Sequence, residues 1–163
     1  MGQSVIRPEP YQPGEAVALA ELFYQTVHAV CTGDYTPAQL DAWADGKVDI
    51  AAWEQSFLRH DTLVARIDGK IVGFADLDGG YLDRLYVHKE HQRQGVAAAL
   101  VQALEKLAMA RGERCMTTHA SITARPFFEK QGYRVIREQQ VERKGLRLTN
   151  FVMEKTLKTA VDK

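Results

Sequence analysis

The sequence lacks most of the features that would tie a protein to a membrane or to nucleic acid. Its 21 basic and 21 acidic residues cancel, so it has no general electrostatic attraction to nucleic acid or to an anionic membrane. No apolar run approaches the ~18 residues of a membrane span, and the opening stretch MGQSVIRPEP has no apolar core of the kind a secretion signal needs. We therefore predict a cytoplasmic protein that binds neither nucleic acid nor a membrane.

Cysteine is scarce as well, and the common nucleotide-binding glycine motifs are missing. Cys31 and Cys115 stand far apart and in no spacing typical of metal ligands. We expect two reduced, partly buried thiols, no disulfide and no metal site. The sequence contains neither G-x-x-x-x-G-K-[ST] nor G-x-G-x-x-G followed by an acidic residue ~20 positions on. Two frequent phosphate-binding signatures are thus excluded.

The composition is that of one ordinary globular domain. Of the 163 residues, 45% are apolar and 26% are charged. A chain of this size buries roughly 70% of its unfolded surface, which is enough to fold without a disulfide or a metal ion. We predict a single domain over residues 1–156 and a frayed tail over residues 157–163.

The hydrophobic periodicity predicts a mixed α/β or α+β domain. Thr36, Pro37 and Gln39 are placed to cap a helix, and Asp68-Gly69 between two β-rich runs predicts a hairpin. The helix after Gly95 is expected to form a crossover between two neighbouring strands. The predicted strands are 4–7, 62–67, 71–77, 81–87, 115–119, 134–141 and 146–153, and the predicted helices are 15–30, 37–44, 50–59, the stretch between Gly95 and Gly112, and 123–131.

The most informative segment connects the strand at 81–87 to the helix after Gly95 and reads LYVHKEHQRQGVA. Gly95 and Ala97 have little or no side chain, so the backbone there can approach a ligand closely, and the first helical amides are free to donate. Such a turn suits a phosphate or a pyrophosphate, with Arg93 and Lys89 adding charge. The same residues also suit a plain loop and a helix cap, and this segment alone does not decide between the two.

Two motifs in this order resemble those of the GNAT superfamily of acyl-CoA-dependent N-acetyltransferases. Gln92-x-x-Gly95-x-Ala97, preceded by Leu85-Tyr86-Val87-His88, resembles the [Q/R]-x-x-G-x-[G/A] turn after the family's fourth strand. The stretch ASITARPFFEKQGY at 120–133 is similar to N-x-x-A-x-x-[FL]-Y-E-x-x-G-F. The resemblance covers about residues 4–153, and Tyr35–Trp43 with Ala120–Glu129 further resembles a little-characterised bacterial branch.

The resemblance implies a mostly antiparallel sheet of about six or seven strands, with helices on both faces and the fourth and fifth strands splayed into a V-shaped opening. It also implies acetyl-CoA as the cofactor. The pantetheine arm would pair with backbone at Leu85 and Val87, and the pyrophosphate would bind amides of the turn. The residues expected to bind acetyl-CoA are Leu85, Tyr86, Val87, Gln92, Arg93, Gln94, Gly95, Val96, Ala97, Ser121, Phe127 and Phe128.

Acetyl transfer to an amine needs an unprotonated nucleophile, a polarised thioester carbonyl and a proton for the thiolate. The resemblance assigns the carbonyl to a backbone amide near Val87. We expect Asp83 to be the base, because many similar proteins carry a glutamate there. Its ordinary pKa of ~3.9 would have to rise, or a water chain would have to intervene. A solvated aspartate paired with Arg84 or Arg66 is the alternative. His119, across the opening, is the second candidate base because imidazole titrates near neutral pH.

The general acid departs from the family pattern. Where many relatives carry a tyrosine that protonates the thiolate, this chain has Phe128, which has no proton to donate. Tyr133, Tyr81 or water could replace it, or the thiolate could leave unprotonated. Ser121 likewise stands where the family often has asparagine, although its hydroxyl could still reach the pantetheine. We name Asp83, His119 and Tyr133 as the candidate catalytic residues.

The acceptor is expected to bind between the first two helices and the last strand pair. The candidate residues are aromatic and weakly polar, which suits a small amine or an aromatic molecule, although aromatics at helical spacing are usually core residues. We predict transfer of acetyl to a small-molecule amine by direct attack in a ternary complex, in a monomer or a homodimer. The alternatives are acetylation of a protein or peptide and a non-catalytic acyl-CoA sensor. The candidate acceptor-binding residues are Tyr24, His28, Tyr35, Trp43 and Tyr81.

Overall fold

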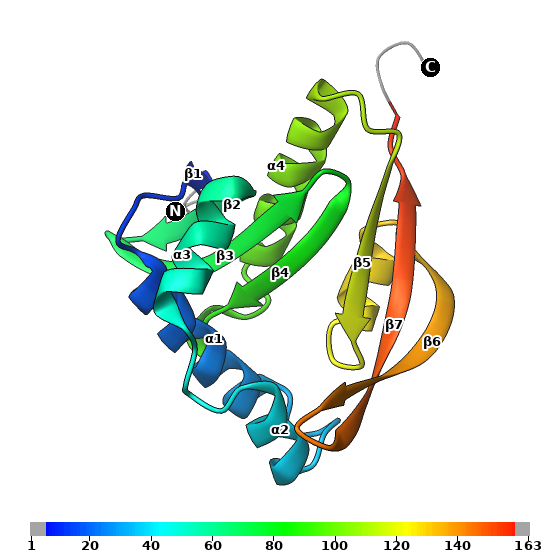
Figure 1. The fold of residues 1–163 in the computed structure, drawn as a ribbon. Helices are drawn as coiled ribbons and strands as arrows, with labels where there is room; N and C mark the ends of the chain where they lie inside the picture. Colours follow the sequence, from blue (N-terminus) through cyan, green and yellow to red (C-terminus); the bar gives the residue numbers. More distant parts are fainter. Residues whose placement is uncertain (1–5, 159–163) are drawn as a thin grey trace.

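The computed structural model describes residues 6–158, in which a seven-stranded sheet carries helices on both faces (Figure 1). This confirms the mixed α/β class predicted from the sequence. The helices are α1 (Ala16–Val30), α2 (Pro37–Trp43), α3 (Ile50–Arg59), α4 (Val96–Ala110) and α5 (Arg125–Lys130), with a short 3-10 helix η1 (Lys89–His91). The strands are β1 (Glu9–Pro10), β2 (Asp61–Ile67), β3 (Lys70–Asp78), β4 (Tyr81–Val87), β5 (Cys115–Ser121), β6 (Arg134–Arg143) and β7 (Leu146–Thr156).

The strands lie in the order β1-β2-β3-β4-β5-β7-β6. Within residues 6–158, β4 and β5 are the one parallel pair, and α4 is the crossover between them. They pair at only two positions, Tyr81 with Thr117 and Leu82 with Thr118. Beyond Leu82 the strands diverge, as Figure 1 shows. The predicted splay is therefore confirmed.

The divergence has a local cause in β4 and a partner for β5. The register between β3 and β4 shifts where Asp76 faces Arg84 and Leu77 faces Leu82, which leaves Asp83 as the extra residue of a bulge. A bulge bends its strand and increases the local twist. Meanwhile β5 pairs with β7 along its whole length, from Cys115 to Ser121. After Leu82, β4 consequently follows β3 and β5 follows β7.

Each face of the sheet has its own hydrophobic cluster. The α1 and α3 face packs Leu19 and Phe57 against Val64 and Phe74, and all four are at most 1% exposed. The α4 and α5 face is built around Leu100 and other fully buried side chains: Leu104, Leu82, Met116 and Met153. Because helices cover both faces, six consecutive residues of β3 are buried.

The local predictions agree closely with the structure in the middle of the chain. The predicted capping box is present, because the Thr36 side chain accepts from the Gln39 amide and the Gln39 side chain accepts from the Thr36 amide. Asp68 and Gly69 both have positive φ, at 52° and 79°, as a tight hairpin turn requires. Gly95 and Gly112 delimit α4 as predicted, with φ of 84° and 86°.

The ends of the chain differ from the predictions. Of the strand predicted at 4–7, Ile6 and Arg7 form no strand, and the first two residues lie outside the described range. The segment that pairs with β2 is instead Glu9–Pro10. Proline has no N–H to donate, but it is tolerated here because β1 is an edge strand. The prediction of a frayed tail is wrong for Leu157. Its side chain is 4% exposed, and its amide donates to the Arg114 carbonyl. Residues 159–163 lie outside the described range.

Two smaller features also differ. The helix predicted at 123–131 is shorter, because the Ser121 hydroxyl accepts from the Ala124 amide (3.0 Å) and holds a turn before α5 begins. Cys31 is buried and Cys115 is exposed, so neither thiol is partly buried as expected. Over residues 6–158, the length and hydrophobicity needed to cross a bilayer do not occur together in any helix.

Candidate active site

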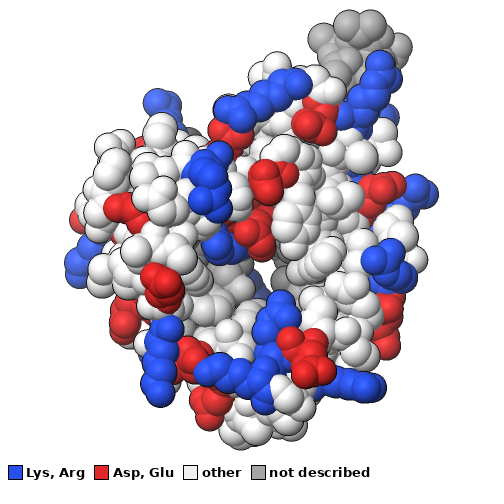
Figure 2. Space-filling model, viewed as in Figure 1, with Lys and Arg blue, Asp and Glu red and all other residues white. Residues whose placement is uncertain are grey.

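Two cavities open into the gap between β4 and β5 and meet inside it. We call them the turn cavity, of about 680 Å³, which adjoins the segment 91–98, and the aromatic cavity, of about 410 Å³, which adjoins α1, α3 and the β6–β7 hairpin. Figure 2 shows the hollow between the two halves of the molecule. Both cavities are lined by the same five residues, which we call the junction: Trp43, Asp83, Tyr86, His119 and Ser121.

The turn cavity carries a backbone conformation suited to an anion. Arg93 and Gly95 both adopt positive φ, at 61° and 84°, with one residue between them, and Gly95 directly precedes α4. Such a turn directs successive amides to one side, next to the free amides at the helix N-terminus. A side chain added at Gly95 would meet nothing within 4 Å, so the space in front of it is open. The turn therefore has a shape suited to the pyrophosphate that it is predicted from the sequence to bind.

The free edge of β4 forms one wall of the turn cavity. The His88 amide donates to the Val72 carbonyl (2.7 Å), which continues the β3–β4 ladder. Because ladder bonds alternate, the peptide groups of Leu85 and Val87 face the gap. The Val87 carbonyl accepts from Gln92 Nε2 (2.6 Å), so the motif glutamine fastens the turn to the end of the strand.

Eleven of the twelve residues predicted to bind acetyl-CoA line the turn cavity. The exception is Gln94, whose side chain folds back onto η1, where its Oε1 lies 3.1 Å from His91 Nδ1. Lys89 lines neither cavity. The structure adds a wall from α1 that the motifs do not reveal, formed by Thr26, Val30 and Cys31.

The aromatic cavity contains three of the five residues predicted to bind the acceptor: Tyr35, Trp43 and Tyr81. Tyr24 and His28 line neither cavity, so that prediction is wrong for both. They are one helical turn apart on α1, and their rings lie together with centroids 4.3 Å apart. His28 Nε2 is 2.7 Å from the Ala44 carbonyl, on a side of the helix away from the cavity, whereas Phe23 lines it.

The two candidate bases, Asp83 and His119, both lie at the junction. Burial and the nearby Arg137 guanidinium lower the pKa of His119 below its ordinary value, and Asp83 partly opposes them. The imidazole is therefore neutral at pH 7 and ready to accept a proton. The Tyr81 ring meets His119 edge-on, with centroids 5.2 Å apart, and burial raises the pKa of its phenol.

Comparison with known proteins places this geometry in a family. The profile of the acetyltransferase (GNAT) domain matches residues 31–157. The chain belongs to the GNAT acetyltransferases. It is 38% identical over 143 residues to YafP of Escherichia coli K12, an uncharacterized N-acetyltransferase, covering 88% of this chain and 91% of YafP.

Solved structures agree with the GNAT assignment. A GCN5-related N-acetyltransferase from Rhodopseudomonas palustris, also named a class-II aminotransferase, is 37% identical with a TM-score of 0.91, over 96% of this chain and 99% of that one. The PaiA N-acetyltransferase of Thermoplasma acidophilum, solved with coenzyme A, shares the fold at 18% identity and a TM-score of 0.76, over 94% of this chain and 99% of its own. This GNAT protein is thus an N-acetyltransferase with acetyl-CoA as its cofactor, as predicted.

Tyr133, a predicted catalytic residue, lies away from both cavities of this GNAT domain. It is 3% exposed and lines neither cavity, and its hydroxyl donates to Glu105 Oε2 (2.9 Å) within the α4 core. Glu105 also binds Lys155 Nζ (3.1 Å), so the tyrosine belongs to a buried structural network. Phe128 does line the turn cavity, where it offers no proton. Among the substitutes predicted for the acid, Tyr81 is the one that lines the aromatic cavity.

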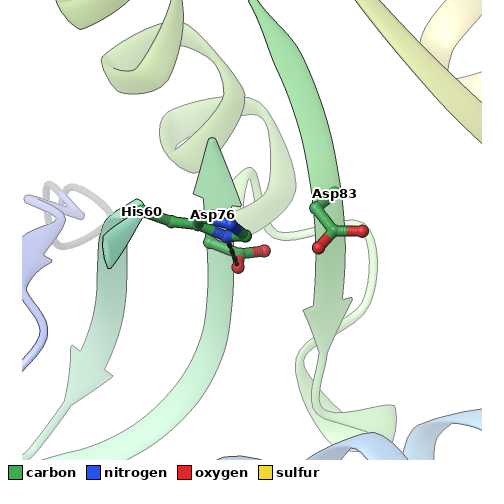
Figure 3. Close-up of side chains that lie close together, drawn as sticks. All are labelled: His60, Asp76 and Asp83. Atoms are coloured by element: carbon green, nitrogen blue, oxygen red, sulfur yellow. Dashed lines mark hydrogen bonds and ion pairs between the residues drawn. The ribbon is translucent and has the colours of Figure 1, made fainter. Parts of the chain in front are cut away.

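A buried polar network behind the junction was not foreseen. Figure 3 shows His60 against Asp76, with Asp83 on the neighbouring strand. Asp76 is 0% exposed, and its Oδ2 lies 2.8 Å from His60 Nδ1 and 2.6 Å from Arg84 NH1. His60, Asp76 and Asp83 offer ligand atoms close enough together to hold a metal ion. However, the Arg84 guanidinium already supplies the cation at Asp76. We therefore interpret the cluster as an arginine-centred network.

Proposed function

We propose that this acetyltransferase moves the acetyl group to the amine of a small molecule by direct attack, with both substrates bound at once. The observation that carries the proposal is the junction, where two separate cavities share five residues. An acceptor in the aromatic cavity and acetyl-CoA in the turn cavity would meet there. No covalent relay through a side chain is needed.

The size and walls of the aromatic cavity favour a small acceptor over a peptide. Its volume of about 410 Å³ falls within the range of roughly 300–1,000 Å³ that is usual for small-molecule sites. Phe23 and Trp53 line it from the helices, and Val141 and Leu148 line it from the β6–β7 hairpin. A peptide would need an open, elongated groove instead.

The chain's own groups can meet the needs of the reaction. Acetyl-CoA supplies an acyl group activated as a thioester. The free amides of Leu85 and Val87 would orient it along β4, and the backbone of the turn would hold its pyrophosphate. Neutral His119 would take the proton from the attacking amine, with Asp83 beside it as the alternative base.

Cytoplasmic location and a monomeric or homodimeric state remain predictions from the sequence.

The direct test offers the protein acetyl-CoA with a panel of primary amines and of peptides with free N-termini. Release of the CoA thiol measures turnover, and mass spectrometry identifies the acetylated product. We expect turnover with small amines and none with peptides. Asp83→Asn and His119→Ala should lose most of the turnover while still binding acetyl-CoA. The opposite preference, for peptides over every small amine, would overturn the proposal.

Thermal unfolding with acetyl-CoA separates an enzyme from a sensor. At ~100 times the dissociation constant, a ligand adds ~2.7 kcal/mol of stability. We expect a clear upward shift with acetyl-CoA, larger than with ATP or NAD, in the wild type and in both variants. A shift without turnover on any amine or peptide would favour the acyl-CoA sensor.

A further inference from the structure

The wall of the aromatic cavity contains charged side chains of both signs. Two arginines, Arg84 and Arg143, line it together with a single carboxylate, Asp83. Asp83 lies at the junction, where the amine of the acceptor has to be, whereas both arginines line the aromatic cavity alone. Arg84 NH2 lies 3.9 Å from Asp83 Oδ2, whereas Arg143 pairs with no carboxylate of residues 6–158, so its charge is placed beyond the reacting amine, toward the rest of the acceptor.

Arg84 is held rigidly in the wall of this cavity. Its guanidinium carbon lies 4.8 Å from the ring centroids of both Trp53 and Phe57. NH1 donates to Asp76 Oδ2 (2.6 Å) and NH2 donates to Ser56 Oγ (3.0 Å). Only two of the five N–H groups of this guanidinium have acceptors among the described residues. Because Asp76 balances its charge, Arg84 contributes oriented donors and little net charge.

Arg143, at the end of β6, supplies the net charge. Its NH1 donates to the Glu142 carbonyl (2.9 Å), and it forms no ion pair with any carboxylate of residues 6–158. Its neighbour Lys144, in contrast, pairs with Asp45. The Arg143 charge reaches the cavity, since it acts on the phenol of Tyr81. A cation without an acidic partner beside a small-molecule cavity is free to pair with a ligand anion.

We propose that the acceptor carries a carboxylate as well as its amine, so that it is an amino acid with an apolar or aromatic body. This inference rests on the proposed function. The amine would lie at Asp83 and His119, the body between the aromatic walls, and the carboxylate against Arg84 and Arg143.

A polyamine acceptor is disfavoured by the same arrangement. Its second ammonium group would face Arg143, and like charges at close range repel. A neutral amine would leave the free N–H groups of Arg84 without an acceptor. Of the simple amine classes, the amino acid alone pairs with groups at both ends of the cavity.

The test compares an aromatic L-amino acid with its amide and with its decarboxylated amine, and repeats the trio with an aliphatic body. kcat/KM is corrected for the unprotonated fraction of each amine. We expect the wild type to prefer the acid about tenfold or more, mainly through KM. Arg143→Gln should reduce that preference to nearly none, by raising KM for the acid more than for its amide or its decarboxylated amine. Arg147 lies on the same hairpin and lines neither cavity, so Arg147→Gln is the matched control.

The outcomes separate the two proposals. Equal use of all three compounds, or a preference for the acid that survives Arg143→Gln, overturns the carboxylate inference and leaves small-molecule acetylation standing. Acetylation of peptides with no small amine accepted overturns the proposed function and this inference with it. Arg84→Lys keeps a cation beside Asp76 but loses the planar fork, so it should raise KM for the acid more than for the amine.

Discussion

Opposing neighbours set the charge state of His119. Burial and Arg137 lower the pKa of the imidazole, and Asp83 raises it. If His119 is the base, kcat/KM falls as the pH drops through that pKa, which lies below 6.5. Arg137→Gln removes a cation and should move this acidic limb to higher pH. Asp83→Asn should move it to lower pH, with much reduced activity.

pH–rate profiles of the purified variants measure both shifts. Arg134→Gln on the same strand is the control, because Arg134 pairs with Glu154 (3.3 Å) and is not among the causes of the His119 shift. Its limb should coincide with that of the wild type. An acidic limb that persists in His119→Ala would transfer the role of base to Asp83.

Substituting the glycines at the two ends of α4 distinguishes the effect of backbone strain from the effect on ligand binding. Gly95 and Gly112 have nearly equal φ, 84° and 86°, and neither would crowd an added Cβ. Glutamate at either position should therefore cost a similar ~1–2 kcal/mol of stability. Gly95→Glu alone places a carboxylate at the turn cavity, so we expect it to abolish the thermal shift with acetyl-CoA. Gly112→Glu should retain the shift, and equal binding by both variants would refute the placement of the pyrophosphate.

At the scale of elements, Tyr35, between α1 and α2, is bonded to the β5–β7 side of the splayed sheet. Its hydroxyl accepts from the Ile122 amide (2.9 Å), after β5, and donates to the Thr149 carbonyl (2.6 Å) of β7. Tyr35→Phe leaves both backbone groups without this partner, and we expect a loss of about 1–3 kcal/mol in the free energy of unfolding. Denaturant titration measures it. Tyr24→Phe, on an exposed ring of α1, is the control and should change stability little.

An element could be predicted from the sequence when the residues that determine it are close together in the chain. The cap at Thr36, the hairpin at Asp68-Gly69 and the ends of α4 depend on adjacent residues, and all agree with the structure. The edge strand Glu9–Pro10 depends on a partner 53 or more positions away, so local reading placed it too early. Leu157 is buried for the same reason, since its amide bonds to Arg114 across the sheet.

At the scale of the whole molecule, the site depends on a bulge that no short motif reveals. Asp83 is the unpaired residue in the register of β3 and β4, and it lies where β4 leaves β5. The two motifs predicted much of the turn cavity because most of its lining lies in two short stretches of sequence, 85–98 and 118–130. The aromatic cavity is assembled from α1, α3 and the distant β6–β7 hairpin. Helical spacing on α1 therefore could not distinguish Phe23, which lines it, from Tyr24.

The arrangement of the two cavities also predicts the kinetic order. Because they meet only at the junction, the acceptor and acetyl-CoA can occupy the protein together. Double-reciprocal plots should intersect, as expected for a ternary complex. Cys31 is the thiol in the turn cavity, but burial raises its pKa, so it is a protonated and poor nucleophile at neutral pH.

Cys31→Ser should accordingly retain turnover, and mass spectrometry of the protein incubated with acetyl-CoA alone should show no acetylated Cys31. Cys115→Ser, at the exposed start of β5, controls for the loss of a thiol elsewhere. Parallel plots together with an acetylated Cys31 would mean that the acetyl group passes through the protein. In that case the junction would not be the place where both substrates meet.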